Sequence, residues 1–191
     1  MARRAGDKGK TPHPPARLAV PPPPHARHTP TAGTKNGRRE EWKRRRKCLH
    51  LDMKHTFVAG SPEEMDTLAP EILKAIGISR VVAMDAPMGA GKTTLVRALC
   101  KALGTTSIVN SPTFAIINDY ELPGGGSAYH FDLYRLGDVA EAYNMGFDEY
   151  FYSGSYCFVE WPAVAESLLP AETKRLHIEV GAGGERKITV D

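Results

Sequence analysis

The stretch Ala86-Pro87-Met88-Gly89-Ala90-Gly91-Lys92-Thr93 decides the fold of this chain. The apolar run Arg80–Asp85 comes directly before it and predicts a short buried strand. A helical pattern follows from Lys92 to about Leu103, and Gly104 is expected to end that helix. A glycine-rich loop between a buried strand and a helix is the setting that a Walker A phosphate-binding loop requires. The stretch therefore predicts an α/β fold built around a phosphate loop.

The residue types in this loop suit a nucleoside triphosphate. Glycines let the backbone turn its N–H groups toward phosphates, and the helix N-terminus adds the positive end of its dipole. Lys92 can place its ammonium on the β- and γ-phosphates, and Thr93 can offer its hydroxyl to Mg²⁺. Ala86 replaces the first consensus glycine, which is the least chemically involved position of the motif. We expect ATP contacts from Gly89, Ala90, Gly91, Lys92, Thr93 and Thr94.

ATP is favoured over GTP because the sequence contains neither Asn-Lys-x-Asp nor Thr-Lys-x-Asp, the patterns that read guanine. A phosphate loop alone does not separate ATPases from kinases. No clear pocket for a phosphate-accepting small molecule can be identified in the sequence. A small-molecule kinase therefore remains the alternative to an ATPase, and a non-catalytic nucleotide-sensing module is a second one.

Two carboxylates stand where predicted strands end. Asp132 lies in His130-Phe131-Asp132-Leu133-Tyr134-Arg135, and Glu160 follows the apolar run Tyr156–Val159. Mg²⁺-dependent phosphoryl transfer needs such a group for the metal and another to orient water. We expect Asp132 and Glu160 to be catalytic, and both to share the metal with Thr93. His130 is interpreted as a structural histidine rather than a base, since nothing nearby supplies a triad.

The rest of residues 53–191 alternates between strand and helix patterns and then gives way to hairpins. This order predicts a P-loop NTPase-like α/β fold, with a mixed β-sheet flanked by helices. Strands are expected at 55–59, 113–121, 127–133, 156–160, 175–180 and 186–190. Helices are expected from Ser61 to Ile76, at 138–143 and at 162–169.

Charge divides the chain into two unlike parts. Residues 1–52 carry 14 of the 25 lysines and arginines, 4 of the 22 acidic residues and 8 of the 15 prolines. Their balance is +10, against −7 for residues 53–191. We expect residues 1–52 to be a disordered basic, proline-rich extension. On this interpretation the reading frame can also be over-long, with its genuine start at Met53. A nucleic-acid-binding arm and a transit peptide are the alternatives.

The three cysteines, Cys48, Cys100 and Cys157, form no CxxC pair. They therefore indicate neither a disulfide framework nor a zinc site, which favours a reducing cytoplasm. No stretch approaches the roughly 18 apolar residues of a membrane helix, so no membrane partner is expected.

Four motifs in order make the chain similar to the TsaE (YjeE) family, the P-loop ATPases of tRNA threonylcarbamoyladenosine biosynthesis. The similarity covers about residues 55–191, and each motif alone is weaker than the set. The motifs are Gly89–Leu95, Ser111-Pro112-Thr113-Phe114, His130–Arg135 and Glu160-Trp161-Pro162.

The resemblance implies roles for further residues and for partners. Thr113 would lie in a switch-like loop that senses the γ-phosphate, and Trp161 would lie near the nucleotide unless it is simply a packing residue. Arg135 would stabilise charge or contact a partner, or else form an ordinary surface salt bridge. The implied partners are TsaB and TsaD, with tRNA reached through the complex, and isolated hydrolysis should be slow.

Overall fold

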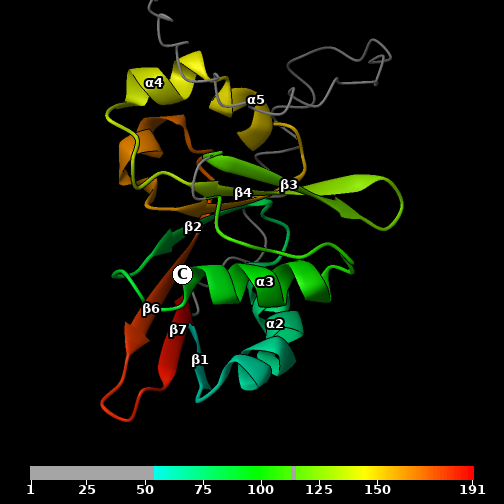
Figure 1. Ribbon diagram of the computed structural model, residues 1–191, viewed down its shortest axis with the longest axis vertical. Helices are drawn as coiled ribbons and strands as arrows, with labels where there is room; N and C mark the ends of the chain where they lie inside the picture. Colours follow the sequence, from blue (N-terminus) through cyan, green and yellow to red (C-terminus); the bar gives the residue numbers. More distant parts are fainter. Residues whose placement is uncertain (1–53, 113–114) are drawn as a thin grey trace, which may run out of the picture.

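The computed structural model describes residues 54–112 and 115–191. Figure 1 draws the remainder in grey. The extension predicted for residues 1–52 and the switch residue Thr113 lie outside the described residues.

Seven strands of the described chain form one mixed sheet, in the order β1-β7-β6-β2-β5-β4-β3. The inner strands β6, β2, β5 and β4 are parallel, while β7, β1 and β3 join antiparallel at the two edges. The strands are β1 His55–Ala59, β2 Val81–Asp85, β3 Ile117–Leu122, β4 Gly126–Asp132, β5 Tyr156–Glu160, β6 Lys174–Val180 and β7 Arg186–Val190. The predicted mixed sheet is confirmed.

Helices cover both faces of this sheet, as Figure 1 shows. One face carries α2 and α3, and the other carries α4, α5 and a 3₁₀ helix, η1. Their bounds are α2 Pro62–Ile76, α3 Lys92–Ala102, α4 Val139–Asn144, α5 Phe147–Phe151 and η1 Pro162–Leu168. None of the helices in the described ranges is long and apolar enough to cross a membrane.

Helix α2 forms where the sequence predicts it, and side chains cap its start. The Ser61 hydroxyl accepts a hydrogen bond from the Glu64 amide, and the Glu64 carboxylate accepts one from Gly60 N–H at 2.7 Å. These contacts satisfy N–H groups that a helix start leaves unpaired. At the other end, Gly77 has a φ of 71° and donates to the Leu73 carbonyl.

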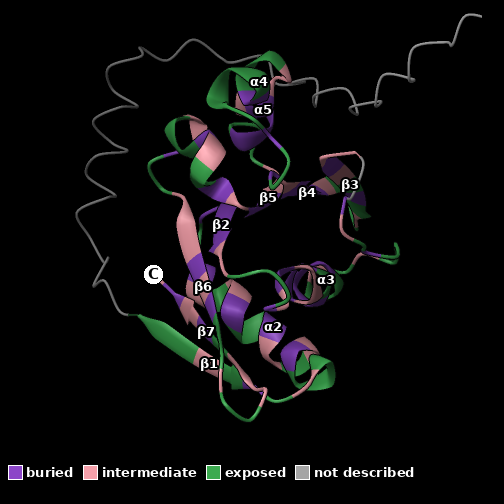
Figure 2. Ribbon diagram, turned by 60° about the vertical axis from the view of Figure 1, so that its left-hand side comes forward, coloured by how far each residue is buried: buried purple, intermediate pink, exposed green. Residues whose placement is uncertain are grey.

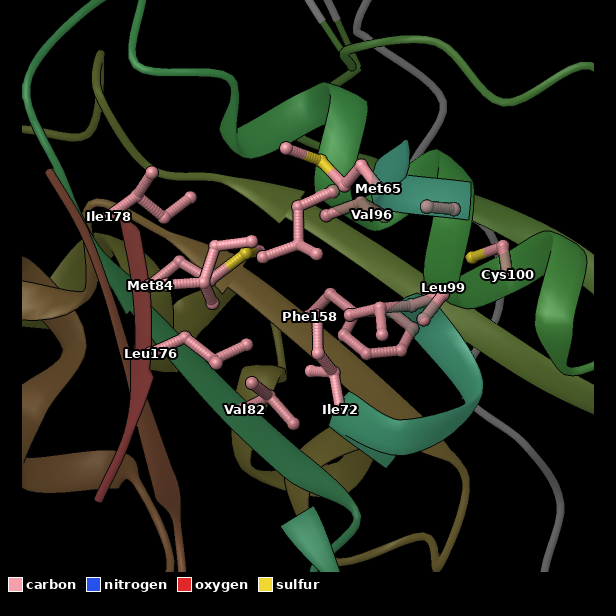
Figure 3. Close-up of a cluster of buried hydrophobic side chains, with 14 of the residues drawn as sticks. Met65, Ile72, Val82, Met84, Val96, Leu99, Cys100, Phe158, Leu176 and Ile178 are labelled. Carbon is pink, nitrogen blue, oxygen red and sulfur yellow. The ribbon is translucent and has the colours of Figure 1, made fainter. Parts of the chain in front are cut away.

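Alternation along the inner strands divides the core between the two faces. In β5, Phe158 packs toward α2 and α3, while Cys157 and Val159 pack toward α4, α5 and η1. Figure 3 shows the first cluster, with Phe158 beside residues of α2, α3, β2 and β6. Figure 2 shows the contrast between the largely exposed edge strand β1 and the buried strand β2. Burial on both faces holds the inner strands rigid beneath the phosphate loop.

One local prediction was wrong, and one helix was missed. The strand predicted from Thr113 begins at Ile117, because Ile116 takes a left-handed conformation with a φ of 61° that interrupts an extended chain. Helix α5 was not predicted: with five residues it is too short to show periodicity, and burial of its aromatic face stabilises it. Among the aromatic residues, Tyr150 and Phe151 are buried in the core, whereas Tyr134 and Tyr152 are exposed.

Candidate functional site

Three parallel strands end, and helix α3 begins, at the same place. Asp132 of β4 pairs in register with Glu160 of β5, which pairs in turn with Met84 at the end of β2. The loop after β2 leads directly into α3, whose first residue is Lys92. The carboxyl ends of parallel strands are where α/β sheets bind ligands.

A cavity of about 600 Å³ opens at this point, within the size range of small-molecule sites. It brings together most of the site residues predicted from sequence, with Arg135 exposed at its edge. Ala90 is buried in the loop and does not line the cavity. The lining residues are Met88, Gly89, Gly91, Lys92, Thr93, Thr94, Pro112, Ile116, Asp132, Tyr134, Arg135, Glu160 and Trp161.

The loop needs glycine at two of its positions. Gly89 has a φ of 78° and Gly91 a φ of 102°, in the left-handed region that other residues rarely adopt. Gly91 is also the N-cap of α3, and its carbonyl accepts from Leu95 N–H at 2.9 Å. The backbone thus enters the helix with its first N–H groups unpaired within the helix, the arrangement that suits phosphate.

Lys92 is buried and folded back along the loop. Its ammonium donates to the carbonyls of Ala86 at 3.0 Å and Pro87 at 3.1 Å, and lies 4.0 Å from the centre of the Trp161 ring. Burial lowers the pKa of Lys92, while the nearby charges of Glu160 and Asp132 act in the opposite direction. A buried cation whose direct contacts among the described residues are two carbonyls and a ring is suited to gain from an anionic ligand.

Glu160 is the most enclosed carboxylate of the site, with 4% of the residue exposed. Its Oε1 accepts a hydrogen bond of 2.9 Å from the Thr93 hydroxyl and lies 2.9 Å from Nε2 of His130. Hydrogen bonds to an ionised carboxylate are stronger than neutral ones. Glu160 is therefore fixed between the start of α3 and the neighbouring strand.

Asp132 is held separately, at the end of β4. Its Oδ2 accepts from the Ser111 hydroxyl at 3.2 Å, and its Oδ1 accepts from Tyr134 N–H at 3.2 Å. Both carboxylates line the same cavity. The structure thus brings the two predicted acidic residues to one site through different contacts.

Trp161 has an unusual backbone for a bulky residue, with a φ of 58° and a ψ of 52°. Its ring packs against Tyr134, with 5.1 Å between ring centres, as well as against Lys92. Strained non-glycine residues cluster at functional sites. Trp161 therefore forms one wall of the cavity and does not belong only to the core.

Sequence reasoning missed two contacts at this site. His130 was not linked to Glu160. Asp132 pairs in register with Glu160, and His130 lies two residues before Asp132, so His130 lies on the same face of the sheet as Glu160. Arg186, from the distant strand β7, donates to the Ala90 carbonyl at 3.4 Å. No local pattern reveals Arg186, because only the sheet order brings β7 toward the loop.

The described residues contain no group of three or more His, Cys, Asp or Glu side chains placed to hold a metal ion on their own. Mg²⁺ in nucleotide sites is bound through one or two carboxylates, with phosphates and water completing much of its shell. The hydroxyl of Thr93 beside Glu160 fits a site of that kind. The positive-φ glycines and the buried Lys92 fit the phosphates.

Comparison with known proteins identifies a matching protein family. A family model described as "Threonylcarbamoyl adenosine biosynthesis protein TsaE" matches residues 59–188. A tRNA threonylcarbamoyladenosine biosynthesis protein TsaE of Bacillus subtilis is 39% identical over 129 residues, which cover 68% of this chain and 80% of that protein. One from Treponema pallidum is 36% identical over 110 residues, covering 58% and 80%.

A solved structure is also similar. The crystal structure of YdiB from Bacillus subtilis matches with a TM-score of 0.58 and 32% sequence identity. The match covers 74% of this chain and 87% of that one. This chain therefore shares its fold with YdiB.

Proposed function

This chain belongs to the TsaE family of threonylcarbamoyl adenosine biosynthesis proteins, and from that premise we propose that it binds and hydrolyses ATP for this tRNA modification. Membership gives the pathway, tRNA threonylcarbamoyladenosine biosynthesis, and confirms the resemblance found in the sequence. The activity is proposed from the site. TsaB-like and TsaD-like proteins are the proposed partners, with tRNA reached through them.

The observation that carries the proposal is the hydrogen bond from Thr93 to Glu160 inside the cavity. It joins the first turn of the phosphate-loop helix to a carboxylate at the end of a parallel strand. Because the Thr93 hydroxyl donates a hydrogen bond to Glu160, the lone pairs of its oxygen remain available to a metal. Such a hydroxyl–carboxylate pair beside a phosphate loop is the arrangement that phosphoryl transfer with Mg²⁺ uses.

Each residue then has a defined task. Gly89, Gly91 and the first turn of α3 would present backbone N–H groups to the phosphates, and Lys92 would exchange its loop carbonyls for phosphate oxygens. Bound Mg²⁺, held by Thr93, Asp132 and Glu160, would neutralise charge that builds up on the phosphates. Glu160 and Asp132 would orient the attacking water, whose oxygen joins the γ-phosphorus as the bond to ADP breaks.

Several further assignments are part of the proposal. Ala90 and Thr94 complete the phosphate loop, and Trp161 lies beside the nucleotide. Thr113 is assigned to a γ-phosphate-sensing loop. Residues 53–191 form the ATPase domain, residues 1–52 are an accessory extension, and the protein acts in the cytoplasm.

The test is phosphate release from ATP and Mg²⁺ by the full chain, measured alone and with the two partner proteins and tRNA. We expect slow release alone and faster release in the complex. Product analysis in the same samples distinguishes the alternatives: a phosphorylated small molecule would indicate a kinase. Nucleotide binding with no turnover in any mixture would leave a sensing module and contradict the proposal.

A further inference from the structure

His130 is a buried polar side chain for which the proposed hydrolysis gives no role. None of its surface is exposed, and only 4% of Glu160 is exposed. Nε2 of His130 lies 2.9 Å from Oε1 of Glu160, which is hydrogen-bond distance. Buried polar groups this close are paired, so one of the two atoms donates to the other.

The direction of that bond follows from chemistry. An ionised carboxylate only accepts, so Nε2 carries the hydrogen. The same Oε1 also accepts from the Thr93 hydroxyl at 2.9 Å. The other ring nitrogen, Nδ1, is buried and has no hydrogen-bond partner among the described residues. Within that part of the chain, the one polar contact of the imidazole is therefore Glu160.

The backbone fixes where this contact can form. In the parallel pair of β4 and β5, His130 lies opposite Phe158 and Asp132 lies opposite Glu160. Side chains two apart on a strand share a face, so the imidazole lies on the face of Glu160, one step deeper in the sheet. Both strands are buried on both faces, which leaves the two side chains little freedom.

We propose that His130 is the positioning residue of Glu160. Its Nε2–H holds Oε1, which fixes the rotation of the carboxylate and leaves Oε2 as the oxygen that serves the metal and the attacking water. This role rests on the proposed ATPase function for what Glu160 does. His130 acts through Glu160 and touches no reacting atom.

Two substitutions separate positioning from packing. His130→Gln keeps an N–H donor near the place of Nε2, whereas His130→Asn keeps a buried amide that is too short to reach Glu160. We expect His130→Asn to lower the partner-stimulated kcat by about 10- to 100-fold, the usual cost of losing a group that orients a ligand. We expect His130→Gln to retain most of the kcat and a near-normal KM for ATP.

The matched control is Phe158→Leu, which changes the buried residue opposite His130 without removing a donor to Glu160. It measures what loss of packing at this point of the sheet does to Tm and kcat. The proposal is overturned if His130→Gln and His130→Asn lose kcat equally, and if the loss of kcat for a given fall in Tm matches that of Phe158→Leu. His130 would then be only a packing residue.

Two measurements do not depend on turnover. Nitrogen-15 NMR of the wild-type protein, with the His130 signals assigned through His130→Gln, should show a protonated Nε2. A neutral ring protonated at Nδ1 would overturn the proposal. In calorimetry, the gain in ADP affinity on adding Mg²⁺ should shrink in His130→Asn and persist in His130→Gln; an equal gain in both would also overturn it. If the wild type releases no phosphate with any partner, the proposed function fails, while these two measurements still decide the role of His130.

Discussion

The Thr93 hydroxyl donates a hydrogen bond of 2.9 Å to Oε1 of Glu160, across 67 positions of sequence. This bond ties the first turn of α3 to the end of β5, so the phosphate loop and the strand-end carboxylate are held as one unit. A ligand that moves the loop must therefore act on the carboxylate as well. The same contact also makes the effects of substitutions at the two residues dependent on each other.

Lys92→Ala should weaken ATP binding about 10- to 100-fold, because a charge-assisted contact to phosphate is lost. Calorimetry with ATP or ADP measures the effect. Lys101→Ala is the matched control, since Lys101 lies on the same helix but is exposed and pairs with Asp66. Equal affinities for the wild type and Lys92→Ala would show that the phosphates bind elsewhere.

Much of this site could be predicted because its parts are local in sequence. The phosphate loop and the strand-end positions of Asp132 and Glu160 each depend on neighbouring residues. The contact between His130 and Glu160 depends on how β4 and β5 pair, which the local pattern does not specify. The contact of Arg186 with the phosphate loop depends on sheet order in the same way.

The buried charge of Lys92 should lower stability when no nucleotide is bound. Burial lowers the pKa of Lys92, so this side chain binds a proton more tightly in the unfolded chain than in the folded protein. The free energy of unfolding therefore rises as the pH approaches the ordinary pKa of lysine. Lys92→Met should therefore be more stable than the wild type at neutral pH, with a gap that narrows as the pH rises toward the ordinary pKa of lysine, about 10.4. Urea unfolding of both proteins across this range measures the gap; a gap that widens with pH would contradict it.

Cys100 and Cys157 should resist alkylation in the folded protein. Both are fully buried, and burial raises the pKa of Cys100 to about 12 and that of Cys157 as well. Since the thiolate is the reactive form, labelling at pH 8 should wait for unfolding. Peptide mass spectrometry after iodoacetamide treatment, with and without urea, measures the labelled fraction of each cysteine separately. Rapid labelling of either residue without urea would show that its face of the sheet opens readily.

A chain that begins at Met53 should fold and bind ATP like the full protein. The composition of residues 1–52 offers too few apolar residues to form a hydrophobic core. We expect Tm to change by less than about 2 °C, which corresponds to under 1 kcal/mol for a domain of this size. A large drop in Tm or in nucleotide affinity would mean that the extension is part of the domain.

Glu160→Gln should separate catalysis from binding. The glutamine amide keeps the shape of the carboxylate, and its oxygen can still accept from Thr93 and His130. The substitution therefore removes the charge while preserving the local contacts. A group that orients water acts mainly in the transition state, so its loss lowers turnover far more than ground-state affinity.

We therefore expect near-normal ATP binding by Glu160→Gln, with partner-stimulated phosphate release reduced about 10²-fold or more. Parallel calorimetry and phosphate-release assays with the partner proteins measure both quantities, and Asp132→Asn is the matched comparison at the neighbouring strand end. Because Glu160 is the more buried of the two and the one bonded to Thr93, its loss should be the larger. Normal turnover in Glu160→Gln with a deep loss in Asp132→Asn would transfer the water-orienting role to Asp132. Loss of ATP binding alone would instead limit Glu160 to holding Mg²⁺ in the ground state, with no role in orienting water.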